Sequence, residues 1–303
     1  MGFFDKKIRQ MAADDYADST VNLSKAASDK AVDVIKQLSG KDYDNGKKVI
    51  ENVIVFTNAS GGTGASTIIG NVAFAATQRG LNALIIDLNI LCPVQHTYLG
   101  IDQTLEKPDL VSFLNGQDDL RKCIDSTQEI NILFANNRTL SDELNCNNKV
   151  PVDNFISMLQ TVRNYYDLVL IDCPMRIDSL LYNTAFYCCD AIYMVWDEGI
   201  GSIINTEKVR RNMAISGIDS YTKMRVILNK RTSIDFSDFS LKKLNLELID
   251  ELPFSTDIID NGLRGRIFCD KGSATNKNGT EFAHKIDSIT DKILKIGGYI
   301  GSN

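Results

Sequence analysis

One glycine-rich segment stands out in this 303-residue chain because its residue types and spacing suit the binding of an anion. It follows the apolar run Val53–Phe56 and precedes a helical pattern over Thr67–Arg79 that Gly80 closes. Glycines let the backbone turn tightly and approach a ligand, and the N–H groups at a helix N-terminus favour phosphate. We therefore expect a phosphate-binding loop between a strand and a helix, formed by Ser60, Gly61, Gly62, Thr63, Gly64, Ala65, Ser66 and Thr67.

Two aspartates and one asparagine end other predicted strands. Asp87 ends Ala83–Asp87, Asp172 ends Leu168–Asp172, and Asn229 ends Met224–Asn229. Ligands of open parallel sheets bind beyond the carboxyl ends of the strands, so these residues should lie near the loop. Carboxylates and a hydroxyl are oxygen ligands that Mg²⁺ prefers. We predict a Mg²⁺ site of Ser66, Asp87 and Asp172, and expect Asn229 either to contact an adenine edge or to cap a turn.

The elements that must position these residues alternate along the chain from Val49 onward. Besides the strands already named, apolar runs predict strands at Ile130–Ala135 and Ala191–Val195, and a short edge strand at Leu248–Leu252. Helical patterns fall at Phe155–Asn164 and Ser202–Ser216. This alternation predicts an α/β fold with a doubly wound, mostly parallel sheet flanked by helices.

The two ends of the chain have helical patterns of their own. Residues 1–48 are polar and alanine-rich and predict a helical N-terminal extension, which leaves 49–303 as the nucleotide-binding domain. This extension either packs on the domain or docks on a membrane or partner through Phe3 and Phe4. The tail Glu281–Ile296 has one apolar face, for which we expect packing on the sheet, with membrane targeting as the alternative.

Composition narrows the function classes. The net charge of −6 argues against a protein that mainly coats DNA, and we expect the basic run Lys208, Arg210 and Arg211 to be a solvated helix face. Seven cysteines and two histidines without metal-ligand spacing predict reduced thiols, with neither disulfides nor zinc. No apolar run approaches the roughly 20 residues of a membrane span, so we expect a cytoplasmic protein, with peripheral contact at the inner face of the membrane left open.

The loop resembles the deviant Walker A motif of the ParA/MinD superfamily. Further segments are similar to its second strand, its Walker B strand, its base-contacting strand and its late loop, namely Gln78–Asp87, Tyr166–Pro174, Val226–Arg231 and Leu252–Phe254. The resemblance covers Val49 to the C-terminus. It implies a P-loop NTPase-like fold that binds ATP or ADP with Mg²⁺, and a homodimer.

Three charged positions of that family are changed here. Its two loop lysines correspond to Ser60 and Ala65, and the second carboxylate of its Asp-x-Asp pattern corresponds to Asn89. Phosphoryl transfer depends on positioning and charge stabilisation, so we expect at most a weak ATPase and assign no catalytic residue. The candidates for a replacement cation are Lys230, Arg231, Arg264 and Arg266.

The form Gly-Gly-x-Gly-Ala-Ser-Thr further resembles the CpaE/TadZ branch, whose members place pilus machinery at the cell pole. This implies a positioning or scaffold factor with a protein partner from a localisation, secretion or pilus system, although the 48 preceding residues are too few for that branch's receiver-like domain. Two alternatives remain, an active ParA-type ATPase that binds DNA in partition or conjugation and an interaction module without nucleotide. Capsular tyrosine kinases share the fold but end in a tyrosine cluster, where this tail has only Tyr299, so we set them aside.

Overall fold

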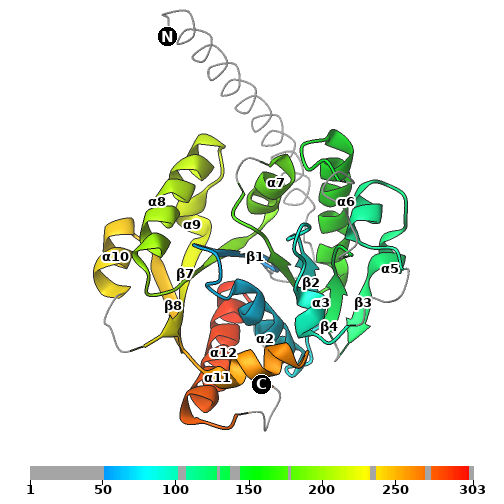
Figure 1. Ribbon diagram of the computed structural model, residues 1–303. Helices are drawn as coiled ribbons and strands as arrows, with labels where there is room; N and C mark the ends of the chain where they lie inside the picture. The colour runs from blue at the N-terminus through cyan, green and yellow to red at the C-terminus, as the bar shows by residue number, and fades with distance from the viewer. Residues whose placement is uncertain are drawn as a thin grey trace, which may run out of the picture.

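The computed structural model describes residues 51–101, 107–127, 130–136, 144–176, 179–232, 237–269 and 274–299. The predicted extension 1–48 lies outside the described residues. Eight strands form one sheet in the order β3-β4-β2-β5-β1-β6-β7-β8 (Figure 1). Strand β3 runs antiparallel to β4, and every other neighbouring pair is parallel.

The strands lie where the apolar runs predict them. Their bounds are β1 Val53–Asn58, β2 Ala83–Asp87, β3 Asp125–Thr127, β4 Ile130–Leu133, β5 Leu168–Asp172, β6 Ala191–Trp196, β7 Met224–Arg231 and β8 Glu247–Pro253. Strand β8 is an edge strand, as predicted. Sequence analysis missed β3 because three half-buried residues carry no hydrophobic period.

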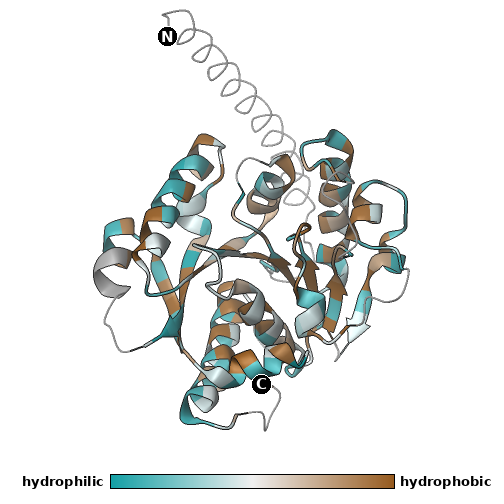
Figure 2. Cartoon of the chain, viewed as in Figure 1, coloured by the Kyte–Doolittle hydropathy of each residue, from teal (hydrophilic) through white to brown (hydrophobic). Residues whose placement is uncertain are grey.

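Helices cover both faces of the sheet and confirm the predicted fold class (Figure 1). One buried cluster joins the sheet to α2 and α12, and the other joins it to α4, α6, α7 and α8. The strands between them are apolar on both faces, as buried parallel strands are (Figure 2). The helices are α2 Ala65–Thr77, α3 Gln95–Tyr98, α4 Leu110–Leu114, α5 Leu120–Cys123, α6 Lys149–Tyr165, α7 Leu180–Cys188, α8 Ile200–Ile215, α9 Ser220–Lys223, α10 Ser237–Leu244, α11 Thr256–Leu263 and α12 Lys277–Ile296.

Two predicted helices begin earlier than expected. Helix α2 begins at Ala65 rather than Thr67, because Gly64 with φ 101° serves as its N-cap. Helix α6 begins at Lys149 rather than Phe155 because a first turn tolerates proline, and Pro151 therefore does not delay its start.

The apolar face of α12 packs on the sheet, as predicted. Phe282, Ile286 and Ile289 on this face are almost completely buried. Because the same face cannot also contact lipid, the membrane-targeting alternative for this helix is wrong. Within the described residues, no helix has both the length and the apolar character needed to cross a bilayer.

The basic run on α8 is not a uniformly solvated face. Arg210 is only 5% exposed, donates to the carbonyl oxygen of Leu244 and lies 4.2 Å from the centre of the Tyr221 ring. Arg211 is exposed and pairs with Glu207 on the same helix. The expectation of a solvated face is therefore wrong for Arg210, because later segments of the chain fold over it.

Candidate functional site

The glycine-rich segment forms a turn that connects β1 to α2. Gly62 and Gly64 have φ values of 81° and 101°, which side chains with a Cβ rarely adopt. A Cβ at Gly64 would also lie 2.4 Å from Nδ2 of Asn229. Position 64 therefore requires glycine both for its backbone conformation and for its contact with β7.

Two asparagines hold this turn from neighbouring strands. Oδ1 of Asn58 at the end of β1 accepts hydrogen bonds from Oγ1 of Thr63 at 2.6 Å and from the backbone N of Ala65 at 3.1 Å. Nδ2 of Asn229 donates to the carbonyl oxygen of Thr63 at 2.7 Å. Sequence reasoning found Asn229 but missed Asn58, although a polar residue that ends an apolar strand directly before such a turn is a usable signal.

The turn leaves several backbone donors available for a ligand. Among the described residues, no acceptor within the chain takes the N–H groups of Gly61, Gly62, Thr63, Gly64, Ser66 and Thr67. The first N–H groups of an α-helix have no partner within the helix, and here those of a strained turn lie beside them. Such a concave set of donors fits an anion, and it fits phosphate oxygens in particular.

Asp87 and Asp172 lie side by side next to this turn. They are register partners on β2 and β5, and their exposed fractions are 0% and 3%. Asp87 accepts the backbone N–H groups of Asn89, Val94 and Gln95 at 2.9–3.0 Å. The sequence prediction that both strand ends meet at one edge is thus confirmed for these two carboxyl groups.

The two carboxyl groups are electrostatically strained. Burial, together with the negative charge of Asp172, raises the pKa of Asp87 to about 8. Burial also raises the pKa of Asp172, although hydrogen bonds from Ser66 and Gln95 oppose the shift. Within the described part of the chain, no Lys or Arg pairs with either group. A divalent cation suits this site, because it would neutralise both carboxylates.

Gln95 links the turn to both aspartates, and sequence analysis missed it. Its Nε2 donates to the carbonyl oxygen of Ser66 at 3.0 Å and to Oδ2 of Asp172 at 2.8 Å. Its backbone N donates to Asp87. A lone glutamine before a four-residue helix carries no sequence signal for such a role, because its partners lie in distant segments.

The four candidate cations differ in position. Lys230 reaches the turn, where its Nζ donates to the carbonyl oxygen of Gly62 at 2.5 Å. Arg231 pairs with Glu251 and Arg264 with Asp260, both at 2.9 Å. Arg266 is exposed and makes no hydrogen bond to the turn. Of the two lysine positions, Ser60 is half-buried, whereas Ala65 is fully buried in the core beneath α2.

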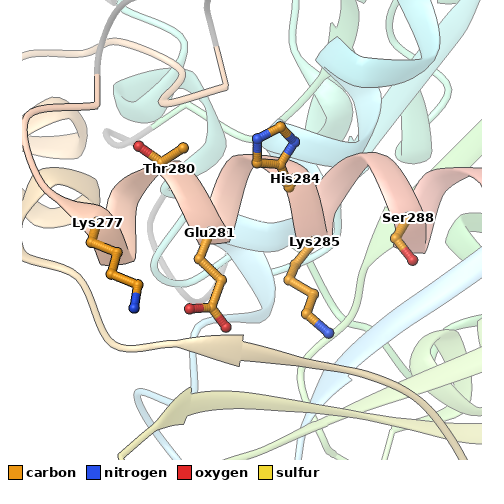
Figure 3. A pocket seen from close by; sticks show the side chains of 6 residues that line it. All are labelled: Lys277, Thr280, Glu281, His284, Lys285 and Ser288. Carbon is orange, nitrogen blue, oxygen red and sulfur yellow. The ribbon is translucent and has the colours of Figure 1, made fainter.

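A pocket on the outer face of α12 is separate from this site. The side chains that line it are Lys277, Thr280, Glu281, His284, Lys285 and Ser288 (Figure 3). None of them belongs to the glycine-rich turn or to the strand ends beside it. The pocket therefore belongs to the contact region between α12 and the edge of the sheet.

Comparisons with known proteins follow this geometry. The sequence profile of a family described as AAA domain matches residues 51–214. A tyrosine-protein kinase CpsD of Streptococcus pneumoniae is 28% identical over 182 residues, which cover 59% of this chain and 75% of the kinase. A putative septum site-determining protein MinD of Emiliania huxleyi is 25% identical over 230 residues, which cover 71% of this chain and 79% of that protein.

A solved structure has a similar fold. The septum site-determining protein MinD of Pyrococcus horikoshii, complexed with Mg-ADP, superposes with a TM-score of 0.66 and is 20% identical. The match covers 82% of this chain and 97% of that one. At this level of identity the likeness establishes the arrangement of strands and helices.

Proposed function

The chain belongs to the AAA-domain family within the ParA/MinD P-loop superfamily, and from this premise we propose that it binds ATP or ADP with Mg²⁺ and hydrolyses ATP slowly or not at all. One observation carries the proposal. The turn presents unused N–H groups beside two buried carboxyl groups, while Ser60 and Ala65 bring no positive charge to it.

Each part of the ligand has residues suited to it. The N–H groups of residues 61–67 would bind the phosphates, and Ser66, Asp87 and Asp172 would hold Mg²⁺. When bound, Mg²⁺ supplies charge neutralisation to the phosphates. Asn229 orients the turn through its Nδ2, which leaves its Oδ1 to accept a hydrogen bond from the adenine amino group.

Slow hydrolysis follows from what surrounds the phosphates. A single arginine finger is worth about 10³–10⁵ in rate in related phosphoryl-transfer enzymes. Here both lysine positions are neutral, and Asn89 stands where the family has a second carboxylate. A site that retains phosphate donors but lacks these charges favours holding a nucleotide over cleaving it.

A protein of this kind would act as a nucleotide-dependent positioning or scaffold factor. We include in the proposal a homodimer formed through the nucleotide face, since Leu91, Ile200 and Ile204 near the same sheet edge are 49–70% exposed. The cargo would be a protein of a localisation, secretion or pilus system. A cytoplasmic location, with peripheral contact at the inner face of the membrane, completes the proposal.

Titration calorimetry with ATP and Mg²⁺ tests the binding step. We expect wild-type protein to bind and Asp172→Asn to lose Mg²⁺-dependent binding. Asp167→Asn is the matched control, because Asp167 lies just before the other end of the same strand and accepts the backbone N of Asn82. Absence of binding by wild-type protein would select the nucleotide-free interaction module, and hydrolysis as fast as in lysine-bearing relatives would overturn the scaffold proposal.

The DNA-binding alternative is weaker than the sequence suggested. Its basic run depends on three residues, and burial removes Arg210 from the surface while Glu207 neutralises Arg211. Nonspecific DNA binding requires several exposed cations, because it releases counterions from phosphates. A salt-sensitive DNA mobility shift that Lys208→Glu and Arg211→Glu abolish would restore this alternative.

A further inference from the structure

Lys230 is the cation that the fold brings to the glycine-rich turn. It lies near the end of β7, directly after Asn229, and its side chain is exposed. Its Nζ donates to the carbonyl oxygen of Gly62 at 2.5 Å. The ammonium group therefore lies at the rim of the same turn whose N–H groups have no partners.

The backbone around Lys230 is held in an unusual shape. Lys230 has φ 58°, in the left-handed region that side chains with a Cβ seldom adopt. The pairing of β7 with β8 is irregular between Leu228 and Arg231, so the strand bulges at this point. Such conformations cost about 1–3 kcal/mol each and persist where the surroundings impose them.

Contacts on both sides of Lys230 fix this bulge. Before it, Asn229 donates to Thr63 within the turn. After it, Glu198 accepts hydrogen bonds from the backbone N and Oγ1 of Thr232 at 3.1 and 2.6 Å. The direction in which Lys230 leaves the strand is thus specified by its neighbours.

Lys230 also differs from the nearby arginines in having its charge unpaired. Arg231 and Arg264 are each engaged by a carboxylate. Within the described part of the chain, Lys230 forms no ion pair, and its only hydrogen bond goes to a neutral carbonyl group. Hydrogen bonds between ionised partners are roughly twice as strong as neutral ones, so a phosphate oxygen at the turn would be a better partner than Gly62.

We propose that Lys230 binds the phosphates of the nucleotide and supplies, from β7, the positive charge that Ser60 and Ala65 do not supply. This inference rests on the proposed nucleotide-binding function. Lys230 is then a binding residue for the phosphates, whereas Asn229 serves the base and the shape of the turn. Its contribution should grow with the charge of the ligand and should vanish for a ligand without phosphates.

Calorimetry on the full chain with ATP, ADP and adenosine, each with Mg²⁺, tests this inference. Lys230→Gln should weaken ATP binding by about 10–100-fold, the range for a lost hydrogen bond to a charged group. The loss should be smaller for ADP, and adenosine binding should not change. Lys230→Arg should retain most of the ATP affinity because it retains the charge. Arg231→Gln is the matched control, since it removes the adjacent charge that Glu251 already neutralises.

Several outcomes would decide the matter. Equal ATP affinity of Lys230→Gln and wild type would overturn the role of Lys230 while leaving the proposed function intact. An equal loss for adenosine and ATP would also overturn it, because it would show that Lys230 only shapes the turn. Failure of wild-type protein to bind any of the three ligands would instead refute nucleotide binding itself. Raising the salt concentration gives a second readout, because screening should weaken ATP binding more in wild type than in Lys230→Gln.

Discussion

Two buried carboxylate sites in this molecule have opposite electrostatics. At the strand ends, Asp87 and Asp172 lie together without a cation, and burial with the mutual charge raises the pKa of Asp87 to about 8. On the edge strand β8, the side chain of Asp250 is 8% exposed and accepts Nζ of Lys285 and Nζ of Lys292, each at 2.7 Å. Burial acts to raise the pKa of Asp250, but the hydrogen bonds from the two lysines outweigh it and lower the pKa to about 2.

The difference separates a structural site from a ligand site. Asp250 joins β8 to α12, and Ser288 and the backbone N of Glu251 complete its hydrogen bonds. Every charge in that cluster has its partner within the chain. The pair Asp87 and Asp172 lacks such partners, which disfavours the folded state unless a proton or a ligand cation is present. Buried groups with strongly perturbed pKa values are typical of functional sites.

The largest predicted effect concerns the unpaired site. A carboxyl group whose folded-state pKa is raised binds protons more tightly when folded, so it destabilises the protein as pH rises from about 4 through about 8. In EDTA and without nucleotide, the free energy of unfolding of wild type should fall relative to that of Asp87→Asn between pH 5 and pH 8. The pKa shift of Asp87 sets an upper limit of about 5 kcal/mol on this change.

Urea denaturation across this pH range measures that effect. Asp167→Asn serves as the control, because Asp167 lies at the far end of β5 and should leave the pH profile parallel to that of wild type. Parallel profiles for wild type and Asp87→Asn would show that the pair carries no electrostatic strain, and the contrast with Asp250 would disappear.

The paired site gives the second prediction. Asp250→Ala should lower the free energy of unfolding by about 1.5–3 kcal/mol at pH 7, because it removes charged hydrogen bonds that attach α12 to β8. The matched variant Glu247→Gln lies on the same strand in an exposed ion pair with Arg225 and should cost less than about 1 kcal/mol. Chemical denaturation of the two variants measures both values.

The pH dependence of this second effect has the opposite sign to the first. The folded-state pKa of Asp250 is lowered from 3.8 to about 2, so its stabilisation is complete above pH 4 and is lost as pH falls toward 2. Wild type and Asp250→Ala should therefore converge in stability in acid. A constant difference down to pH 2 would indicate that packing, rather than charge, joins β8 to α12.

Sequence analysis predicted the parts of this comparison that depend on local patterns. Apolar runs located the strands, glycines located the turn, and the strand-end rule placed Asp87 beside Asp172. It did not find Gln95, whose bond to Asp172 spans 77 positions, or the lysines of Asp250, which follow it by 35 and 42 positions. Such contacts depend on how helices dock, which hydrophobic periodicity does not encode.

The assigned roles of the loop residues remain predictions, since the geometry fits a nucleotide without including one. The error at Arg210 has a similar cause to the omissions. A charge run on a helix predicts a solvated face, but the covering residues Tyr221 and Leu244 come from segments that follow α8. Burial of a single charged residue therefore has to be observed in the structure.

The smallest predicted effect tests whether burial is what distinguishes the two sites. Arg79 also joins α12 to its neighbour, here α2, through Asp287 and Asp291 at 3.2 and 2.9 Å, but these carboxylates are 59% and 66% exposed. Exposed ion pairs contribute about 0.2–1 kcal/mol and are screened by salt. Arg79→Gln should therefore cost less than Asp250→Ala, and its cost should shrink in 1 M NaCl. If denaturation instead gave equal, salt-independent losses for both variants, the number of ion pairs rather than their burial would determine how firmly α12 is held. The contrast between the two carboxylate sites would then need another explanation.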